Sequence, residues 1–451
     1  MTLVRAALLL LGLALSACAG HSEKTLAARS ALDAGDPRGA LKALNEELDV
    51  KSEQDLPEKT GGDNSLLLLD RAMVLQQLDK YSLSSRDLEV SDKQIEVLDL
   101  SKNAAADIGR YLFSDDVGPY KAPAYEKLMI NTMNMVNYLA RSDLNGARVE
   151  ARRLAVMQKF TRDTGDAARS LFGPGSYLAG FVFEKSGKPD DALRYYDEAL
   201  EYGRYQTLVD PVRRLTQESS YSSPRIRELL GQTPGAKGEA GSAGDAAKSD
   251  DGELLVIVNF GRVPAKYSKR LPVGLALTYA SGILSPMDQA QANRLALQGL
   301  VTWVNYPELG RPRGTYHQPS FQLDGQWAHL EGILAVDQEA ARAWEQARGA
   351  VVASAITRMI TRVVAGETTK KVAGGGILGE LLSLGTQATL TATDTPDTRS
   401  WATLPARIAF GRLRVHPGVH EIQLASGGWH KTQRVTIKPG GWAVVNLTAL
   451  N

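Results

Sequence analysis

A stretch of small and polar residues near the middle of the chain separates two parts of different character. Residues 231–252 read GQTPGAKGEAGSAGDAAKSDDG and contain no aromatic residue and no valine, leucine or isoleucine. Such a segment cannot bury enough apolar surface to offset the entropy of ordering it, and it is typical of a flexible linker. We therefore expect two separately folding parts, a helical part over residues 22–230 and a mixed α/β part over residues 253–451. The expected fold class is α+β and multidomain.

The first part carries apolar residues at helical spacing, and a unit of this pattern recurs. The clearest copy covers residues 176–200, where Gly180 and Ala192 lie on either side of Gly187. This spacing resembles a tetratricopeptide (TPR) repeat, in which small side chains let two antiparallel helices approach closely and a glycine permits the turn between them. A plain helical bundle remains the alternative. Weaker copies follow the same frame over residues 28–47, 72–91 and 135–154.

A TPR-like array has a concave face that can hold a peptide or a partner helix. Four side chains of the clearest copy are the predicted protein-binding groove residues: Tyr177, Phe181, Arg194 and Tyr195. Aromatic residues at helical spacing are also common in helix cores, so a structural role stays open for them.

The second part contains several strand patterns. Residues 253–260 form an apolar strand, and residues 321–336 and 407–415 alternate apolar and polar side chains. The region of about residues 405–451 resembles the small β-sandwich modules, called PEGA-like, of bacterial envelope proteins. Within it, three segments joined by glycine-rich turns predict an antiparallel β-meander: residues 419–425, 431–437 and 442–448.

Two features of the second part admit more than one interpretation. Residues 337–365 predict a long helix that either covers a sheet in the core or docks on a membrane or a partner. Arg358 and Arg362 interrupt its apolar face, which argues against a transmembrane span. Trp429 and Trp442 lie beside glycine-rich turns, where they could stack on the sugar rings of a glycan.

The amino terminus has the pattern of a secretory signal peptide. Arg5 is followed by an uncharged apolar run from Ala6 to Ala14, which is too short to span a bilayer. We therefore expect residues 1–17 to be removed on export.

Leu15-Ser16-Ala17-Cys18 at the end of this signal resembles the lipobox of bacterial lipoproteins. The resemblance implies that Cys18 carries covalent lipid such as palmitate and that residues 18–21 form a lipidated tether. Anchoring by more than one acyl chain is stable. Ala19 after the cysteine implies sorting to the outer membrane, on its periplasmic face. Cys18 is the only cysteine, so no disulfide is expected.

Composition and motifs argue against several classes of function. The chain has 52 Lys and Arg against 51 Asp and Glu, so it exerts no general attraction on nucleic acid. No metalloprotease, P-loop or nucleophile-elbow pattern is present. His416, His420 and His430 could approach one another, but exposed strand-end histidines are commoner than metal ligands. We expect no enzyme, no metal site and no cofactor besides the lipid.

Several motifs together resemble one protein family. They are Tyr125–Met129, Asn137–Leu139, Gly146–Arg153 and Asp397–Pro405, the last reading DTRSWATLP. Similar segments occur in a poorly characterised family of TPR-containing bacterial outer-membrane lipoproteins, often encoded near activator lipoproteins of penicillin-binding proteins. The resemblance implies a role in the cell envelope and suggests the cell-wall synthesis machinery as a partner. Within the last motif, we expect Asp397, Arg399 and Trp401 to form a structural clasp rather than a ligand site.

The sequence therefore predicts a periplasmic lipoprotein anchored in the outer membrane. Its expected role is that of a protein–protein interaction scaffold or accessory factor for a cell-envelope assembly. The alternative is a glycan- or peptidoglycan-binding protein that acts through the C-terminal β domain.

Overall fold

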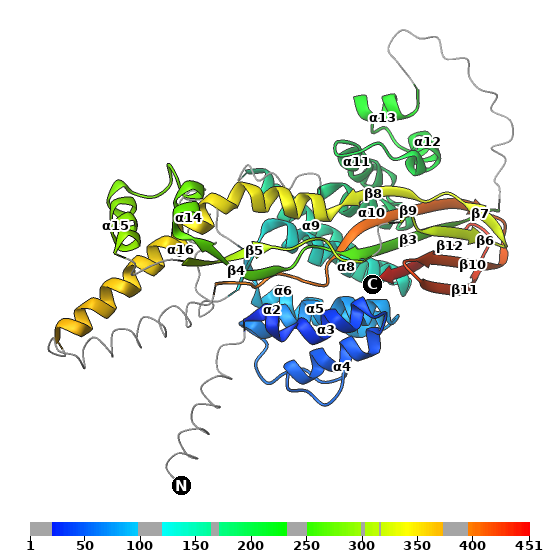
Figure 1. Ribbon diagram of the computed structural model, residues 1–451. Helices are drawn as coiled ribbons and strands as arrows, with labels where there is room; N and C mark the ends of the chain where they lie inside the picture. Colours follow the sequence, from blue (N-terminus) through cyan, green and yellow to red (C-terminus); the bar gives the residue numbers. More distant parts are fainter. Residues whose placement is uncertain are drawn as a thin grey trace.

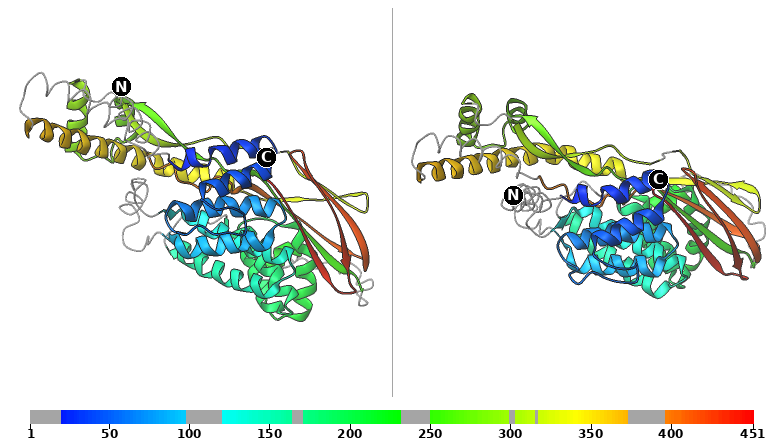
Figure 2. Two further views of the ribbon diagram at one scale, coloured as in Figure 1. Left: turned by 90° about the horizontal axis from the view of Figure 1, so that it is seen from below. Right: turned by 60° about the horizontal axis from the view of Figure 1, so that its bottom comes forward.

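The computed structural model describes residues 20–97, 120–163, 171–231, 250–298, 303–314, 317–372 and 396–451. The described elements include a helical layer, two four-stranded sheets and an arm that projects away from them (Figures 1 and 2). The chain is α+β, with helices in its first half and most strands in its second half, as expected. None of the described helices is both long enough and apolar enough to cross a membrane.

The helical layer comes from the first half of the chain. A 3-10 helix η2 (Gln206–Leu208) precedes α12, and two short strands, β1 (Glu96–Val97) and β2 (Lys121–Ala122), pair in parallel. Of the expected linker, residues 232–249 lie outside the described residues. The α-helices are α2 (His21–Lys24), α3 (Leu26–Asp33), α4 (Pro37–Glu47), α5 (Asp63–Gln77), α6 (Tyr81–Gln94), α8 (Ala124–Ala140), α9 (Leu144–Asp163), α10 (Phe172–Lys185), α11 (Pro189–Leu200), α12 (Val209–Glu218) and α13 (Pro224–Leu229).

Four helix hairpins in this layer share one turn geometry. In each, a residue after the first helix has a φ between 58° and 73°, and the next N–H donates to the carbonyl five residues earlier over 2.8–3.0 Å. This is a Schellman turn, which pairs carbonyls that a helix end leaves free. The four copies of the recurring sequence unit coincide with these hairpins. The turn residues are Gly35, Asp79, Ser142 and Gly187.

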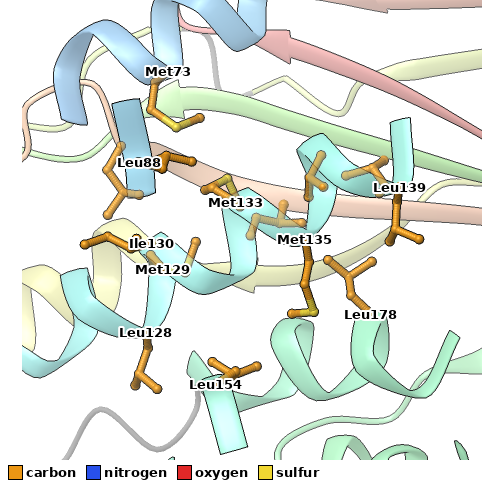
Figure 3. Packing of buried hydrophobic residues seen from close by; sticks show 14 of the residues in the cluster. Met73, Leu88, Leu128, Met129, Ile130, Met133, Met135, Leu139, Leu154 and Leu178 are labelled. Atoms are coloured by element: carbon orange, nitrogen blue, oxygen red, sulfur yellow. The ribbon is translucent and has the colours of Figure 1, made fainter. Parts of the chain in front are cut away.

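Close helix packing depends on small residues at defined positions. A side chain at Gly180 would collide with the ring of Tyr196 on the neighbouring helix, and Ala192 is fully buried there. Larger side chains fill the space between successive hairpins, where leucine and methionine residues of α5, α6, α8, α9 and α10 interlock (Figure 3). The contacts at Gly180 and Ala192 thus show the close approach of α10 and α11 that the sequence predicts.

Two four-stranded sheets form the rest of the body. Their strand orders are β12-β3-β9-β8 in the first sheet and β11-β10-β6-β7 in the second. An apolar cluster that includes Val256 and Val445 from the first sheet and Ile422 from the second joins them as a sandwich. The strands are β3 (Gly252–Arg262), β6 (Ser320–Leu323), β7 (Gln326–Ala328), β8 (Glu331–Ala335), β9 (Pro405–Val415), β10 (Gly418–Ser426), β11 (Trp429–Ile437) and β12 (Trp442–Ala449).

The expected meander is correct for its first two strands and wrong for the third. β10 and β11 form an antiparallel hairpin, but β12 crosses to the first sheet and pairs in parallel with β3. The reason is that β12 is buried on both faces, with Val444 facing the helical layer and Val445 facing the second sheet. Such a strand needs cover on both sides, whereas the outer face of the β10–β11 hairpin is open.

The helical layer and the first sheet share one hydrophobic core, where the sequence suggested two separately folding parts. β3 is buried at every position because its alternate residues serve two cores. Val256 and Val258 face the second sheet, while Leu255 and Ile257 belong to the cluster that fills the helical layer. Gln76 on α5 also accepts a hydrogen bond from Thr448 Oγ1 on β12 over 2.9 Å. The two halves are therefore parts of one body.

The arm is built from residues between the strands of the sandwich. β4 (Lys266–Pro272) and β5 (Trp303–Leu309) form an antiparallel ribbon that carries α14 (Val273–Tyr279) and α15 (Pro286–Leu297). Helix α16 (Val336–Val372) runs along them and away from the body (Figure 2). Its apolar side belongs to a separate cluster with β4, β5, α14 and α15. The long helix expected at 337–365 thus covers this small ribbon rather than the main sheets.

Candidate functional site

The predicted groove residues fall into two groups. Tyr177 and Phe181 are fully buried, because the first sheet lies on the inner face of α10. The Tyr177 ring lies 4.7 Å from that of Phe410, and the Phe181 ring meets Trp442 edge-on at 5.8 Å, measured between centroids. The inner face of the helical layer therefore holds the protein's own sheet, and these two side chains are not accessible to a partner.

Arg194 and Tyr195 lie on the other side of the hairpin. Tyr195 is half-buried and stacks on Phe183 at 5.1 Å, and Arg194 is exposed with its guanidinium 5.8 Å from the ring centre of Tyr221. The structure thus separates the four predicted groove residues, leaving only Arg194 and part of Tyr195 on an accessible surface.

A buried ionic cluster ties the helical layer to the first sheet. Arg412 of β9 donates to Glu184 and to Glu253, both over 2.6 Å, and to the hydroxyl of Tyr196 over 2.9 Å. Lys185 and Arg214 also contact Glu253. Because all the strongly buried charges here are paired, the cluster fixes the position of the sheet on the helices.

The electrostatics of this cluster favour fixed charges. Burial alone would raise the pKa of Glu253, but the charges of Arg412 and Lys185 outweigh it and hold that pKa well below its ordinary value. Burial likewise raises the pKa of Glu184, but the charge of Arg412 outweighs it, so this pKa is also lowered. Carboxylates held ionised in this manner are poor proton donors, so the arrangement is structural rather than suited to acid–base chemistry.

The Asp-Thr-Arg-Ser-Trp motif closes the opposite end of this interface. Asp397 and Arg399 form an ion pair at 2.8 Å, with Arg399 almost fully buried. Trp401 is completely buried; its indole N–H donates to the carbonyl of Leu69 on α5 over 3.1 Å, and its backbone N–H donates to Glu126 on α8 over 3.1 Å. The motif therefore has the geometry of the expected clasp.

Two buried carboxylates, Asp70 and Glu126, accept hydrogen bonds from this clasp. Thr403 donates from its backbone N–H and its hydroxyl to Asp70, over 2.9 Å each. Burial raises the pKa of Glu126 above its ordinary value, against hydrogen bonds from Tyr120 and Trp401 that lower it. Asp70 and Glu126 come from helices, so the clasp holds a segment near the C-terminus inside the helical layer.

A surface cleft of about 370 Å³ lies where the α3–α4 turn and the end of α5 meet the β11 and β12 strands. Trp429, Arg38 and His430 line it together with Gln77. Gln77 is 4% exposed, and neither its amide nitrogen nor its oxygen has a hydrogen-bond partner within the described chain. An aromatic face beside a free amide suits a ligand rich in hydroxyl or amide groups.

Gln77 was not among the residues that sequence reasoning selected. No local pattern marks it, because the cleft arises only when α5 meets a strand some 350 residues later. Arg412, by contrast, carried a usable signal. It lies on the same face of its strand as Ile408 and Phe410, where a charge among apolar residues indicates a buried partner.

The other predicted ligands are placed as follows. Trp442 is partly buried against Phe181, and Trp429 lines the cleft described above. His420 Nδ1 donates to a carboxylate oxygen of Asp324 over 2.7 Å, and His416 contacts Asp251 over 2.6 Å. Within the described ranges, no three histidine, cysteine, aspartate or glutamate side chains are grouped so that they could hold a metal ion. Cys18 lies outside the described residues.

Comparison with known proteins gives no assignment: no family model matches the chain, and no curated protein matches its sequence.

Proposed function

We propose that this protein is a periplasmic lipoprotein anchored in the outer membrane, where it acts as an interaction scaffold or accessory factor for a cell-envelope assembly. The sequence up to Cys18 supports the anchor, and the motif resemblance supports the envelope role. The chain contains four hairpins of one geometry, in keeping with a TPR-like array. We further propose cell-wall synthesis proteins as the class of partner, on the resemblance alone.

The observation that carries the proposal is where the folded body begins. Gly20, two residues after Cys18, is already buried, and the N–H of Ser22 donates to Thr398 Oγ1 over 3.2 Å. Two residues of extended chain span about 7 Å. A lipid on Cys18 would therefore hold the body directly at the membrane surface, which raises its effective concentration for partners of the same membrane.

The partner surface of this proposal is the outward face of α11. The inner face of the helical layer is filled by the first sheet, so a partner has to bind elsewhere. Arg194 and Tyr195 offer an exposed cation and a half-exposed ring on the strongest copy of the repeat. Arginine and tyrosine are enriched at the energetic centres of protein interfaces.

In-cell photo-crosslinking tests this surface. A photoreactive residue at Arg194 is expected to capture one dominant periplasmic or outer-membrane protein, and Tyr195→Glu should remove that product. A photoreactive residue at the buried Tyr177 serves as the matched control and should give only intramolecular products. A protein profile at Arg194 identical to that at Tyr177 would show that this face has no specific partner.

The cleft beside Trp429 supports a second candidate function, glycan binding. Its free Gln77 amide can exchange hydrogen bonds with an acetamido or hydroxyl group while Trp429 packs against a sugar ring. Titration with soluble peptidoglycan fragments should give saturable binding that Trp429→Ala and Gln77→Leu each weaken at least tenfold. Trp327→Ala, which changes an exposed tryptophan on β7, is the control. Equal binding by all variants would eliminate this cleft.

A further inference from the structure

The arm concentrates the exposed apolar side chains of the molecule. We define it as residues 265–309 and 336–372. Among the described residues, thirteen large hydrophobic side chains are exposed, and seven of them lie on the arm. The most exposed are Leu297 at 90% and Met287 at 75%, and Trp303 is 48% exposed. The others are Tyr267, Leu275, Tyr279 and Ile283. An apolar concentration of this size marks an interaction surface.

The arm is also the basic part of a nearly neutral chain. It contains ten lysine and arginine residues against six aspartate and glutamate residues, whereas the whole chain has 52 against 51. Three of the six acidic residues are already paired within the arm: Glu308 with Lys269, Glu339 with Arg342 and Glu345 with Arg348. This charge distribution favours an anionic surface as the occupant of the arm.

The position of the amino terminus indicates which anionic surface it is. The N–H of Ser22 donates to Thr398 Oγ1, and the N–H of Lys266, at the start of β4, donates to Ser400 Oγ over 3.3 Å. The residues nearest the predicted lipid anchor therefore lie at the base of the arm, and α2 lies close to the β4–β5 ribbon in Figure 1. A bilayer that holds acyl chains at Cys18 is therefore close to the base of the arm.

The residue types on the arm fit that location. Tryptophan and tyrosine prefer the headgroup region, where the ring is buried and the polar atom stays hydrated. Lysine and arginine near the surface of an anionic membrane are attracted to its lipid phosphates. The exposed apolar residues are spread over β4, α14, α15 and β5, which suits a broad surface better than a groove for one helix.

We infer that the arm is a membrane-contact element that lies on an anionic phospholipid surface. Met287, Leu297 and Trp303 enter the headgroup region, and the basic residues of the arm neutralise lipid phosphates. The orientation rests on the proposed anchor at Cys18, but the contact itself is a property of the arm. It gives the body a second attachment point and hence a fixed orientation on the membrane.

Vesicle cosedimentation tests this inference on the complete mature chain with Cys18→Ser, which has no acyl group. Vesicles that contain phosphatidylglycerol should bind the protein, and vesicles of phosphatidylcholine alone should bind it much less. The triple variant Met287→Gln/Leu297→Gln/Trp303→Ala should lose roughly tenfold or more in affinity, since burial of one large apolar side chain is worth about 1.5–3 kcal/mol. Trp327→Ala, on the β6–β7 hairpin of the body, is the matched control and should bind normally.

Three results would overturn the inference. These are equal binding by the triple variant and the parent, no binding to either kind of vesicle, or a dimer in solution that the triple variant breaks while vesicle binding is absent. The last result would assign the surface to a second copy. Circular dichroism and thermal unfolding should be unchanged in the triple variant, because the three side chains are exposed. Failure of acylation in cells would affect the proposed anchor only, since this assay contains no acylated protein.

Discussion

Arg412 is the residue on which the junction between the helices and the first sheet most depends. It places a cation 2.6 Å from each of two buried carboxylates and is itself 2% exposed. Arg412→Met would leave Glu184 and Glu253 buried with less compensating charge, which typically costs about 3–5 kcal/mol. Urea unfolding should show this loss. Arg414→Met, an exposed position on the same strand, should change the free energy of unfolding by about 0.5 kcal/mol or less.

The same cluster predicts a dependence of stability on acid pH. The pKa of Glu253 in the folded state lies below its ordinary value of 4.5, so the unfolded chain binds the proton more readily. The stability contributed by Glu253 is therefore present above pH 4.5 and lost as pH falls towards the folded pKa. Glu253→Gln should flatten the fall of the urea midpoint below this pH. An unchanged acid slope in the variant would rule out this carboxylate as a source.

The residues of the junction differ in how far the sequence could reveal them. Asp397, Arg399 and Trp401 were recognised as a clasp because an ion pair and a large ring occur together in a short motif. Tyr177 and Phe181 were placed in an open groove, and they are buried instead. Helical periodicity identifies an apolar face, but it cannot tell whether the chain's own sheet or a partner covers that face.

At the level of elements, the Asp-Thr-Arg-Ser-Trp clasp should contribute much of the free energy that holds the two halves of the chain together. Trp401 is fully buried and donates to a carbonyl of α5. Removal of a buried tryptophan side chain generally costs about 3–5 kcal/mol. Trp401→Ala should lower the free energy of unfolding by an amount of this order and increase amide hydrogen exchange in both α5 and β9. Trp327→Ala on the exposed β7 should do neither, and an increase confined to β9 would contradict a coupling role.

The sequence predicts those helices and strands whose residue pattern lies within the element itself. The strands β3, β9, β10 and β11 follow from alternation or apolar runs, and the hairpin turns follow from Gly35 and Gly187. The crossing of β12 to the first sheet was not predicted. Its partner β3 lies far away in sequence, and pairing between distant strands leaves no local pattern. The β4–β5 ribbon was missed for a different reason, since Pro272 and Pro307 weaken its strand pattern.

At the level of the molecule, one core extends through the helical layer and the first sheet. The two halves should therefore unfold together, although a linker-like segment joins them. Cleavage at an engineered protease site within residues 231–252 should leave the two fragments associated, and they should separate only in denaturant. Calorimetry of the intact body should give one main transition. Fragments that separate under native conditions would contradict the shared core.

Localisation and orientation both depend on the proposed anchor at Cys18, and mass spectrometry of the amino-terminal peptide from purified outer membranes tests it most directly. We expect a peptide that begins at Cys18 and carries the added mass of acyl chains, together with loss of membrane association in Cys18→Ser when the arm is also substituted. A peptide that retains residues before Cys18, or one with an unmodified thiol, would contradict the proposed anchor.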